Sequence, residues 1–138
     1  MQPIDKFPKE IAQNIACVFT DIDDTLTTEG LLPACAYEAL EALTRAGIHV
    51  APITGRPAGW CDMIARLWPV AGVVGENGAF YFSYERNNKK MIRAYDTDAA
   101  TRSTDRKRLD KVAARILKEV PGCAISVDQA FRDSDLAI

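Results

Sequence analysis

The segment IACVFTDIDDTLTTEG, residues 15–30, runs from an apolar stretch directly into a cluster of acids and hydroxyls. Residues 15–21 are rich in β-formers and predict a strand that is buried on both faces. Asp21, Asp23 and Asp24 follow one another closely, and carboxylates at such short spacing repel each other. The crowding therefore indicates a bound cation, or chemistry that needs neighbouring carboxylates.

Helix and strand patterns alternate after this segment. Pro33 suits the first turn of a helix that ends before Gly47, and IHVAPI, residues 48–53, predicts a second strand. Pro57 opens a second helix, and VAGVVG, residues 70–75, predicts a third strand. This order predicts right-handed crossovers and a parallel sheet with helices outside it.

The pattern changes after Gly78. Two β segments flank Asn87-Asn88, which predicts a hairpin. Residues 96–105 have no apolar period and could form a linker, and an amphipathic helix follows them and ends at Pro121. CAISVD, residues 123–128, and DLAI, residues 135–138, predict two further strands.

Composition excludes several classes of partner. The formal net charge of −2 gives no electrostatic case for nucleic acid or an anionic membrane, and no segment approaches the roughly 20 apolar residues of a membrane helix. The four cysteines lie far apart without a C-x-x-C pair, so we expect buried, reduced thiols and no disulfide or zinc site. With no signal-like N-terminus, the sequence predicts a cytoplasmic protein.

Polar residues gather where the predicted parallel strands end. Ligands of open parallel sheets bind beyond the carboxyl ends of the strands. Asp21 and Asp23 follow the first strand, the ITGR segment follows the second, and GENGA follows the third. Carboxylates suit a magnesium ion, and a hydroxyl with free amides suits a phosphoryl group.

These motifs resemble those of the haloacid dehalogenase (HAD) superfamily. The pattern D-x-D-x-T-L, with Asp21, Asp23, Thr25 and Leu26, resembles motif I, and ITGRP resembles motif II with Thr54. GVVGENGA and FRDSDLAI are similar to segments of the cap-inserted Cof-like and sugar-phosphate phosphatases, subclass IIB. The resemblance covers residues 15–138. It departs at Asp24, where many relatives carry glycine.

The resemblance implies an α/β fold with a Rossmann-like parallel sheet and helices on both faces, incomplete, plus the start of an α+β cap. Residues 1–97 would form the N-terminal part of the core with the hairpin, and residues 98–138 the beginning of the cap. The motif III lysine and the motif IV acids of the family have no counterpart, because Lys89 and Lys90 lie in the hairpin turn and no Gly-Asp pair occurs. The chain is therefore interpreted as an N-terminal portion.

The resemblance also implies a mechanism. Asp21 would attack phosphorus and form an aspartyl-phosphate, and Asp23 would act as general acid and base. Mg²⁺ would bind the Asp21 carboxylate and the Asp23 carbonyl, while Thr54 and Gly55 would hold the phosphoryl group. The expected substrate is a small phosphorylated metabolite, a sugar phosphate. The further residues expected to contact it are Arg56, Asn77 and Arg132.

Other functions stay open at this stage. A phosphotransferase or phosphomutase of the same superfamily would use the same aspartyl-phosphate, and a catalytically inactive fragment would only bind ions or partners. A receiver domain also gathers acids around magnesium, but the D-x-D-x-T spacing counts against it. As a portion, the chain is expected to show little activity and to self-associate through an unpaired sheet edge.

Overall fold

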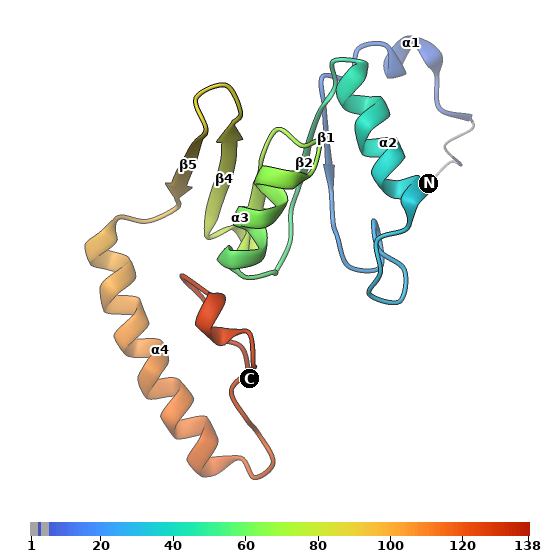
Figure 1. Cartoon of the computed structure of the whole chain (residues 1–138). Helices are drawn as coiled ribbons and strands as arrows, with labels where there is room; N and C mark the ends of the chain where they lie inside the picture. Colours follow the sequence, from blue (N-terminus) through green and yellow to red (C-terminus); the bar gives the residue numbers. More distant parts are fainter. Residues whose placement is uncertain (1–2, 4–5) are drawn as a thin grey trace.

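The strands and helices of the N-terminal half alternate as predicted (Figure 1). The computed structural model describes residue 3 and residues 6–138. After a short helix, α1, the elements that build the core are β1, α2, β2, α3 and β3. Their bounds are Lys9–Ala12 for α1, Cys17–Thr20 for β1, Ala34–Arg45 for α2, His49–Pro52 for β2, Ala58–Leu67 for α3 and Val73–Gly75 for β3.

Three parallel strands run side by side in the order β1, β2, β3. Thr20 pairs with Pro52 in the parallel ladder of β1 and β2. A single parallel bridge between Ile53 and Val74 joins β2 to β3, and the Thr54 amide donates to the Val74 carbonyl at 3.0 Å. The carboxyl ends of the three strands therefore meet at one edge, as the alternating pattern predicts.

Helix α3 packs its buried face on β3 and on the next strand, β4 (Phe80–Glu85). Its buried residues Cys61, Ile64 and Ala65 join a core cluster with Val73 and the two phenylalanines of the neighbouring strand, Phe80 and Phe82. The approach is so close at Gly75 that an added Cβ would lie 2.3 Å from the Phe80 ring and 2.7 Å from the Cys61 sulfur. Only glycine fits there, because side-chain contacts at such distances require the core to shift.

The predicted hairpin is confirmed. Strands β4 (Phe80–Glu85) and β5 (Lys90–Tyr95) pair antiparallel, and the turn between them contains Asn87 and Asn88. β4 also pairs antiparallel with β3, so the hairpin extends the sheet by two strands. A short 3₁₀ helix, η2 (Glu76–Gly78), turns the chain from β3 into β4.

The prediction that the first strand is buried on both faces is wrong for the described residues. Phe19 is 66% exposed, and Ile53 and Tyr81 are also exposed. These side chains share one face, because paired residues in a ladder point to the same side. Within the described strands only the small Ala51 is buried on that face, whereas α3 covers the face that carries Val73 and Phe82.

The predicted linker over residues 96–105 is also largely wrong. Helix α4 runs from Ala99 to Glu119, and the Asp98 carboxylate caps its N-terminus by accepting from the Ala100 and Thr101 amides. These bonds hold the pKa of Asp98 below its usual range. In the part of the chain that the structure describes, no helix is long and apolar enough to cross a membrane.

Residues 123–128 and 135–138 do not form the predicted strands. One backbone hydrogen bond joins them, from the Ser126 amide to the Ala137 carbonyl at 3.0 Å, and a short 3₁₀ helix, η3 (Gln129–Phe131), lies between them. β-Formers make a strand only where a ladder partner is available. Among the described residues this single bond is the only backbone pairing of the two segments, and it does not form a ladder.

The four cysteines differ more than the sequence predicts. Only Cys61 is buried, whereas Cys17, Cys35 and Cys123 are exposed. Burial is the main cause that raises the pKa of Cys61 to about 12. Cys17 lies on the exposed face of β1, Cys35 on the solvent side of α2, and Cys123 in the loop after α4.

We expect a maleimide reagent to modify Cys17, Cys35 and Cys123 in the folded protein and to leave Cys61 unmodified. The fraction of Cys61 present as thiolate is about a thousandfold below that of an ordinary thiol, because its pKa is some three units higher. Mass spectrometry after timed labelling measures this, with urea-unfolded protein as the control in which all four react. Rapid labelling of Cys61 in the folded protein would contradict the packing of α3.

Candidate functional site

Asp21 directly follows β1, at the edge where the parallel strands end. Because Thr20 pairs with Pro52, Asp21 lies beside the chain that leads from Pro52 into Thr54. Its side chain is exposed and accepts a hydrogen bond from the Ile22 amide at 2.7 Å. The carboxylate therefore faces solvent at the position that the sequence predicts.

A tight turn after Asp21 is organised by the buried Ile22. The amides of Leu26 and Thr27 and the Thr27 hydroxyl all donate to the Ile22 carbonyl, at 2.9–3.1 Å. Within this turn Asp24 has φ +55°, a backbone conformation that glycine adopts most easily. This explains physically why the departure at Asp24 falls where the resembled family often carries glycine.

In the loop Thr54–Arg56 after β2, all three carbonyl groups accept hydrogen bonds from other segments of the chain. The Thr54 carbonyl accepts from the Asn77 amide at 3.1 Å, and the Arg56 carbonyl accepts from the Glu76 amide at 3.2 Å. The Gly55 carbonyl accepts from the guanidinium of Arg132 at 3.1 Å. Among the described residues the Gly55 amide has no hydrogen-bond partner, so it remains free to donate to a ligand.

Thr54 itself is buried, at 3% exposure, and its hydroxyl oxygen accepts from the Arg56 amide at 3.1 Å. The hydroxyl hydrogen can still be donated to another acceptor. Thr54 thus keeps one donor for an anion at the strand edge, next to the free Gly55 amide.

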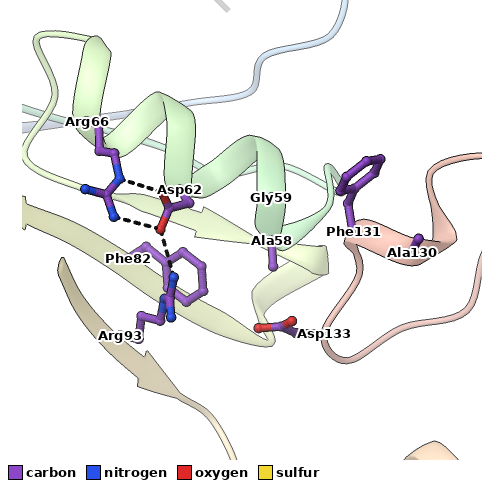
Figure 2. Close-up of a pocket in the computed structure, with 9 residues that line it drawn as sticks. All are labelled: Ala58, Gly59, Asp62, Arg66, Phe82, Arg93, Ala130, Phe131 and Asp133. Carbon is purple, nitrogen blue, oxygen red and sulfur yellow. Dashed lines mark hydrogen bonds and ion pairs between the residues drawn. The ribbon is translucent and has the colours of Figure 1, made fainter.

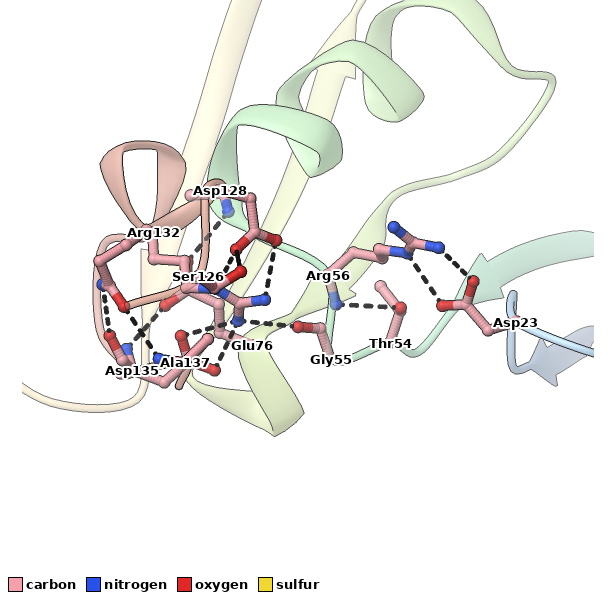
Figure 3. A network of polar contacts seen from close by, with 12 residues as sticks. Asp23, Thr54, Gly55, Arg56, Glu76, Ser126, Asp128, Arg132, Asp135 and Ala137 are labelled. Carbon is pink, nitrogen blue, oxygen red and sulfur yellow. Dashed lines mark hydrogen bonds and ion pairs between the residues drawn. The ribbon is translucent and has the colours of Figure 1, made fainter. Parts of the chain in front are cut away.

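Asp23 and Arg56 form a bidentate ion pair across this edge (Figure 3). The guanidinium Nε lies 3.0 Å from Asp23 Oδ2, and Nη2 lies 2.5 Å from Oδ1. The hydrogen bonds from Arg56 are the main cause that holds the pKa of Asp23 below its usual range. The Arg56 guanidinium also lies over the Trp60 ring, with Cζ 4.5 Å from the ring centroid, so Arg56 contacts both Asp23 and Trp60.

Asn77 has φ +58°, and its side chain faces Gly55, where an added Cβ would lie 3.1 Å from Asn77 Oδ1. The neighbouring Glu76 was missed by sequence reasoning. Its carboxylate is buried, at 3% exposure, and accepts four backbone hydrogen bonds of 2.6–3.0 Å. The donors are the amides of Ala58, Asp133, Ser134 and Asp135. An acid directly after a buried strand, as at Asp21, was the available signal.

Arg132 lies near the predicted site, but its guanidinium is occupied by protein groups. It pairs with Asp128 at 3.0 Å and with Asp135 at 2.9 Å, and it donates to the Gly55 carbonyl. Its side chain is 11% exposed. The prediction that Arg132 contacts substrate stays a prediction, whereas its contact with the Thr54–Arg56 loop is observed (Figure 3).

The cavity beside the ion pair is small. It has a volume of about 110 Å³ and is lined by Asp23, Arg56, Trp60 and apolar residues. A larger cavity of about 480 Å³ lies between α3, the hairpin and η3 (Figure 2). Its walls hold Asp62 paired with Arg66 and Arg93 and none of the predicted site residues.

The oxygens at the strand edge fit part of a magnesium site. The Asp21 carboxylate and the Asp23 carbonyl are hard donors of the kind that Mg²⁺ prefers. Within the described residues no group of three or more His, Cys, Asp and Glu side chains is placed so that it could hold a metal ion by itself. This donor set suits an ion that keeps several waters and is completed by substrate oxygens.

Comparisons with known proteins identify the family and the fold. Residues 18–121 match the family described as haloacid dehalogenase-like hydrolase. A search of curated proteins found no match. The fold is similar to that of a Thermoplasma acidophilum protein, with a TM-score of 0.64, 17% identity, and coverage of 88% of this chain and 49% of that one.

Two phosphatase structures are also similar. A HAD-superfamily phosphatase from Bacteroides thetaiotaomicron has 21% identity and a TM-score of 0.52, over 84% of this chain and 39% of that one. A sugar phosphatase of HAD subclass IIB has 25% identity and a TM-score of 0.50, over 75% of this chain and 37% of that one. The chain thus spans less than half the length of these structures.

We expect Arg56→Gln to raise the pKa of the Asp23 carboxyl towards its ordinary value. Arg56 favours the charged form of Asp23, so its removal makes protonation easier. Carbon-13 NMR of the side-chain carboxyl through an acid titration measures this shift. Asp62 is the internal reference, because its pKa is held low by Arg66 and Arg93 and should not change. An unchanged Asp23 titration would show that the ion pair does not persist in solution.

Proposed function

Because the chain belongs to the haloacid dehalogenase-like hydrolase family, we propose that it is the part of a magnesium-dependent phosphatase that carries the nucleophile and the phosphate-binding loop. The observation that supports this most directly is the meeting of Asp21, Asp23 and the Thr54–Arg56 loop at one sheet edge. The substrate would be a small phosphorylated metabolite. Similarity to a sugar phosphatase of HAD subclass IIB favours a sugar phosphate.

Asp21 is the proposed nucleophile. Its exposed carboxylate would attack phosphorus in line with the departing alkoxide, forming an acyl-phosphate bond as the phosphorus–oxygen ester bond breaks. The Gly55 amide and the Thr54 hydroxyl would donate to the phosphoryl oxygens. Neutral donors held by the protein stabilise the charge of the transferring group without reorganisation.

Asp23 is the proposed acid and base. To protonate the leaving alkoxide it must first carry a proton, which its ion pair with Arg56 opposes. The pair would therefore open when a substrate enters, with Arg56 turning towards the substrate as a contact. Once the alcohol has left, Asp23 would accept a proton from the water that cleaves the aspartyl-phosphate.

Asp21 and the Asp23 carbonyl would hold Mg²⁺, which supplies charge neutralisation between the carboxylates and the phosphate. A phosphotransferase or phosphomutase of the same family would use the same first half-reaction, with an acceptor hydroxyl in place of water. Both reactions need the same residues of this chain. Asn77 beside Gly55 is proposed as a further substrate contact.

Asp21→Asn should lower turnover of an aryl phosphate by at least about a thousandfold, since a neutral amide cannot serve as the nucleophile. The matched control is Asp24→Asn, which changes the neighbouring acid at a position whose positive φ asparagine tolerates. Both are assayed with Mg²⁺ in the longest expressed form of the protein, with sequencing to exclude deamidation. Near-normal turnover by Asp21→Asn would contradict the covalent mechanism.

Magnesium and phosphate should strengthen each other's binding. Because this chain supplies few protein ligands, the phosphate oxygens would complete the coordination of the ion, and the coupling would be about fivefold or more. Isothermal titration of Mg²⁺ with and without inorganic phosphate measures it. Asp21→Asn should remove the coupling, and an equal Mg²⁺ affinity with and without phosphate would argue against a shared site.

A further inference from the structure

The segment Asp128–Asp135 lies against the Thr54–Arg56 loop, although the two are far apart in the sequence (Figure 3). Two charged side chains make the contact, one from the core and one from the C-terminal segment. Glu76 extends from the core into the amides of residues 133–135, and Arg132 extends from the segment to the Gly55 carbonyl. Both are almost fully enclosed by protein.

Glu76 is bonded through both its side chain and its backbone. Its carboxylate joins the N-terminus of α3, through the Ala58 amide, to the amides of residues 133–135. Its own amide donates to the Arg56 carbonyl at 3.2 Å. Hydrogen bonds to a charged acceptor are stronger than those between neutral groups, so this one residue ties three segments together.

Arg132 is oriented by the acids on either side of it. Nε and Nη2 donate to Asp128, and Nη1 donates both to Asp135 and to the Gly55 carbonyl. With its donors used in this way, Arg132 contacts the loop directly in this structure. Together with the amides of Glu76 and Asn77, it satisfies the three successive carbonyls of Thr54, Gly55 and Arg56.

We infer that Glu76 and Arg132 are positioning residues that hold the Thr54–Arg56 loop in its anion-binding conformation. The Gly55 amide and the Thr54 carbonyl belong to one planar peptide, so the bond from the Asn77 amide to that carbonyl fixes the direction of the Gly55 N–H. Arg132 and the Glu76 amide hold the carbonyls of the next two peptides and so restrain the loop around it. The inference rests on the proposed function only in taking phosphate as the group that this loop binds.

The experiment titrates inorganic phosphate into the 138-residue chain with Mg²⁺ present and follows amide shifts by nitrogen-15 NMR. The variants are Glu76→Gln, which puts an amide NH₂ among the backbone donors, and Arg132→Gln, which removes the bond to Gly55. Matched controls are Glu38→Gln on α2 and Arg115→Gln on α4, both exposed and remote from the loop. Arg132→Lys tests whether a single retained donor restores part of the effect.

In the unchanged chain, phosphate should shift the Gly55 amide most strongly. Glu76→Gln and Arg132→Gln should each weaken phosphate binding about tenfold, with the lysine variant between them and the unchanged chain. Hydrogen exchange at residues 133–135 should accelerate at least tenfold in Glu76→Gln and stay unchanged in both controls. If Glu76→Gln fails to fold, Arg132→Gln decides, with Arg132→Lys as the variant that keeps the charge.

The outcomes separate the two claims. If the unchanged chain shows no phosphate response at Gly55, the phosphate-binding loop of the proposed function fails, and the inference fails with it. If phosphate binds but Arg132→Gln binds it equally well, only the positioning role is overturned. Equal effects from the controls and the test variants would likewise overturn it, because the change would then be global.

Discussion

The parallel pairing of β1 with β2 is the constraint on which the candidate site depends. Parallel strands end at the same edge, so a one-residue difference in register would move Asp21 away from Thr54. On one face of the sheet the pairing is fixed by the burial of Val50, which is 1% exposed. On the other face Phe19 of β1 is 66% exposed and contributes little. The packing that fixes this register therefore also fixes which residues lie together at the edge of the sheet.

Elements with strong local signals were predicted well from the sequence. Pro33 and Pro57 stand directly before α2 and α3, where proline has the backbone angle that a helix start needs. The asparagine turn of the hairpin was equally plain. The position of Asp21 and Asp23 beyond the end of β1 was predicted for the same reason, because both residues immediately follow a run of β-formers.

Features that depend on distant residues were not predicted. Whether residues 123–128 form a strand depends on a ladder partner, which β propensity does not report. The donors to the Glu76 carboxylate from the C-terminal segment lie 57–59 residues further along the chain. The start of α4 was missed although its signal is local. Asp98 is an N-cap residue, but the polar residues that follow it show no apolar period.

Position 76 contains a local conflict that has consequences for sequence change. Its φ of +45° favours glycine, yet its side chain accepts four buried hydrogen bonds that only a carboxylate of this length can receive together. Glycine would relax the backbone and orphan the amides, while other residues would keep the strain without the bonds. A conflict of this kind persists where tertiary hydrogen bonds outweigh the backbone preference of the residue. Substitution by glycine and substitution by other residues should therefore both destabilise the fold. We expect Glu76 to tolerate fewer substitutions than the buried Phe80 or Phe82.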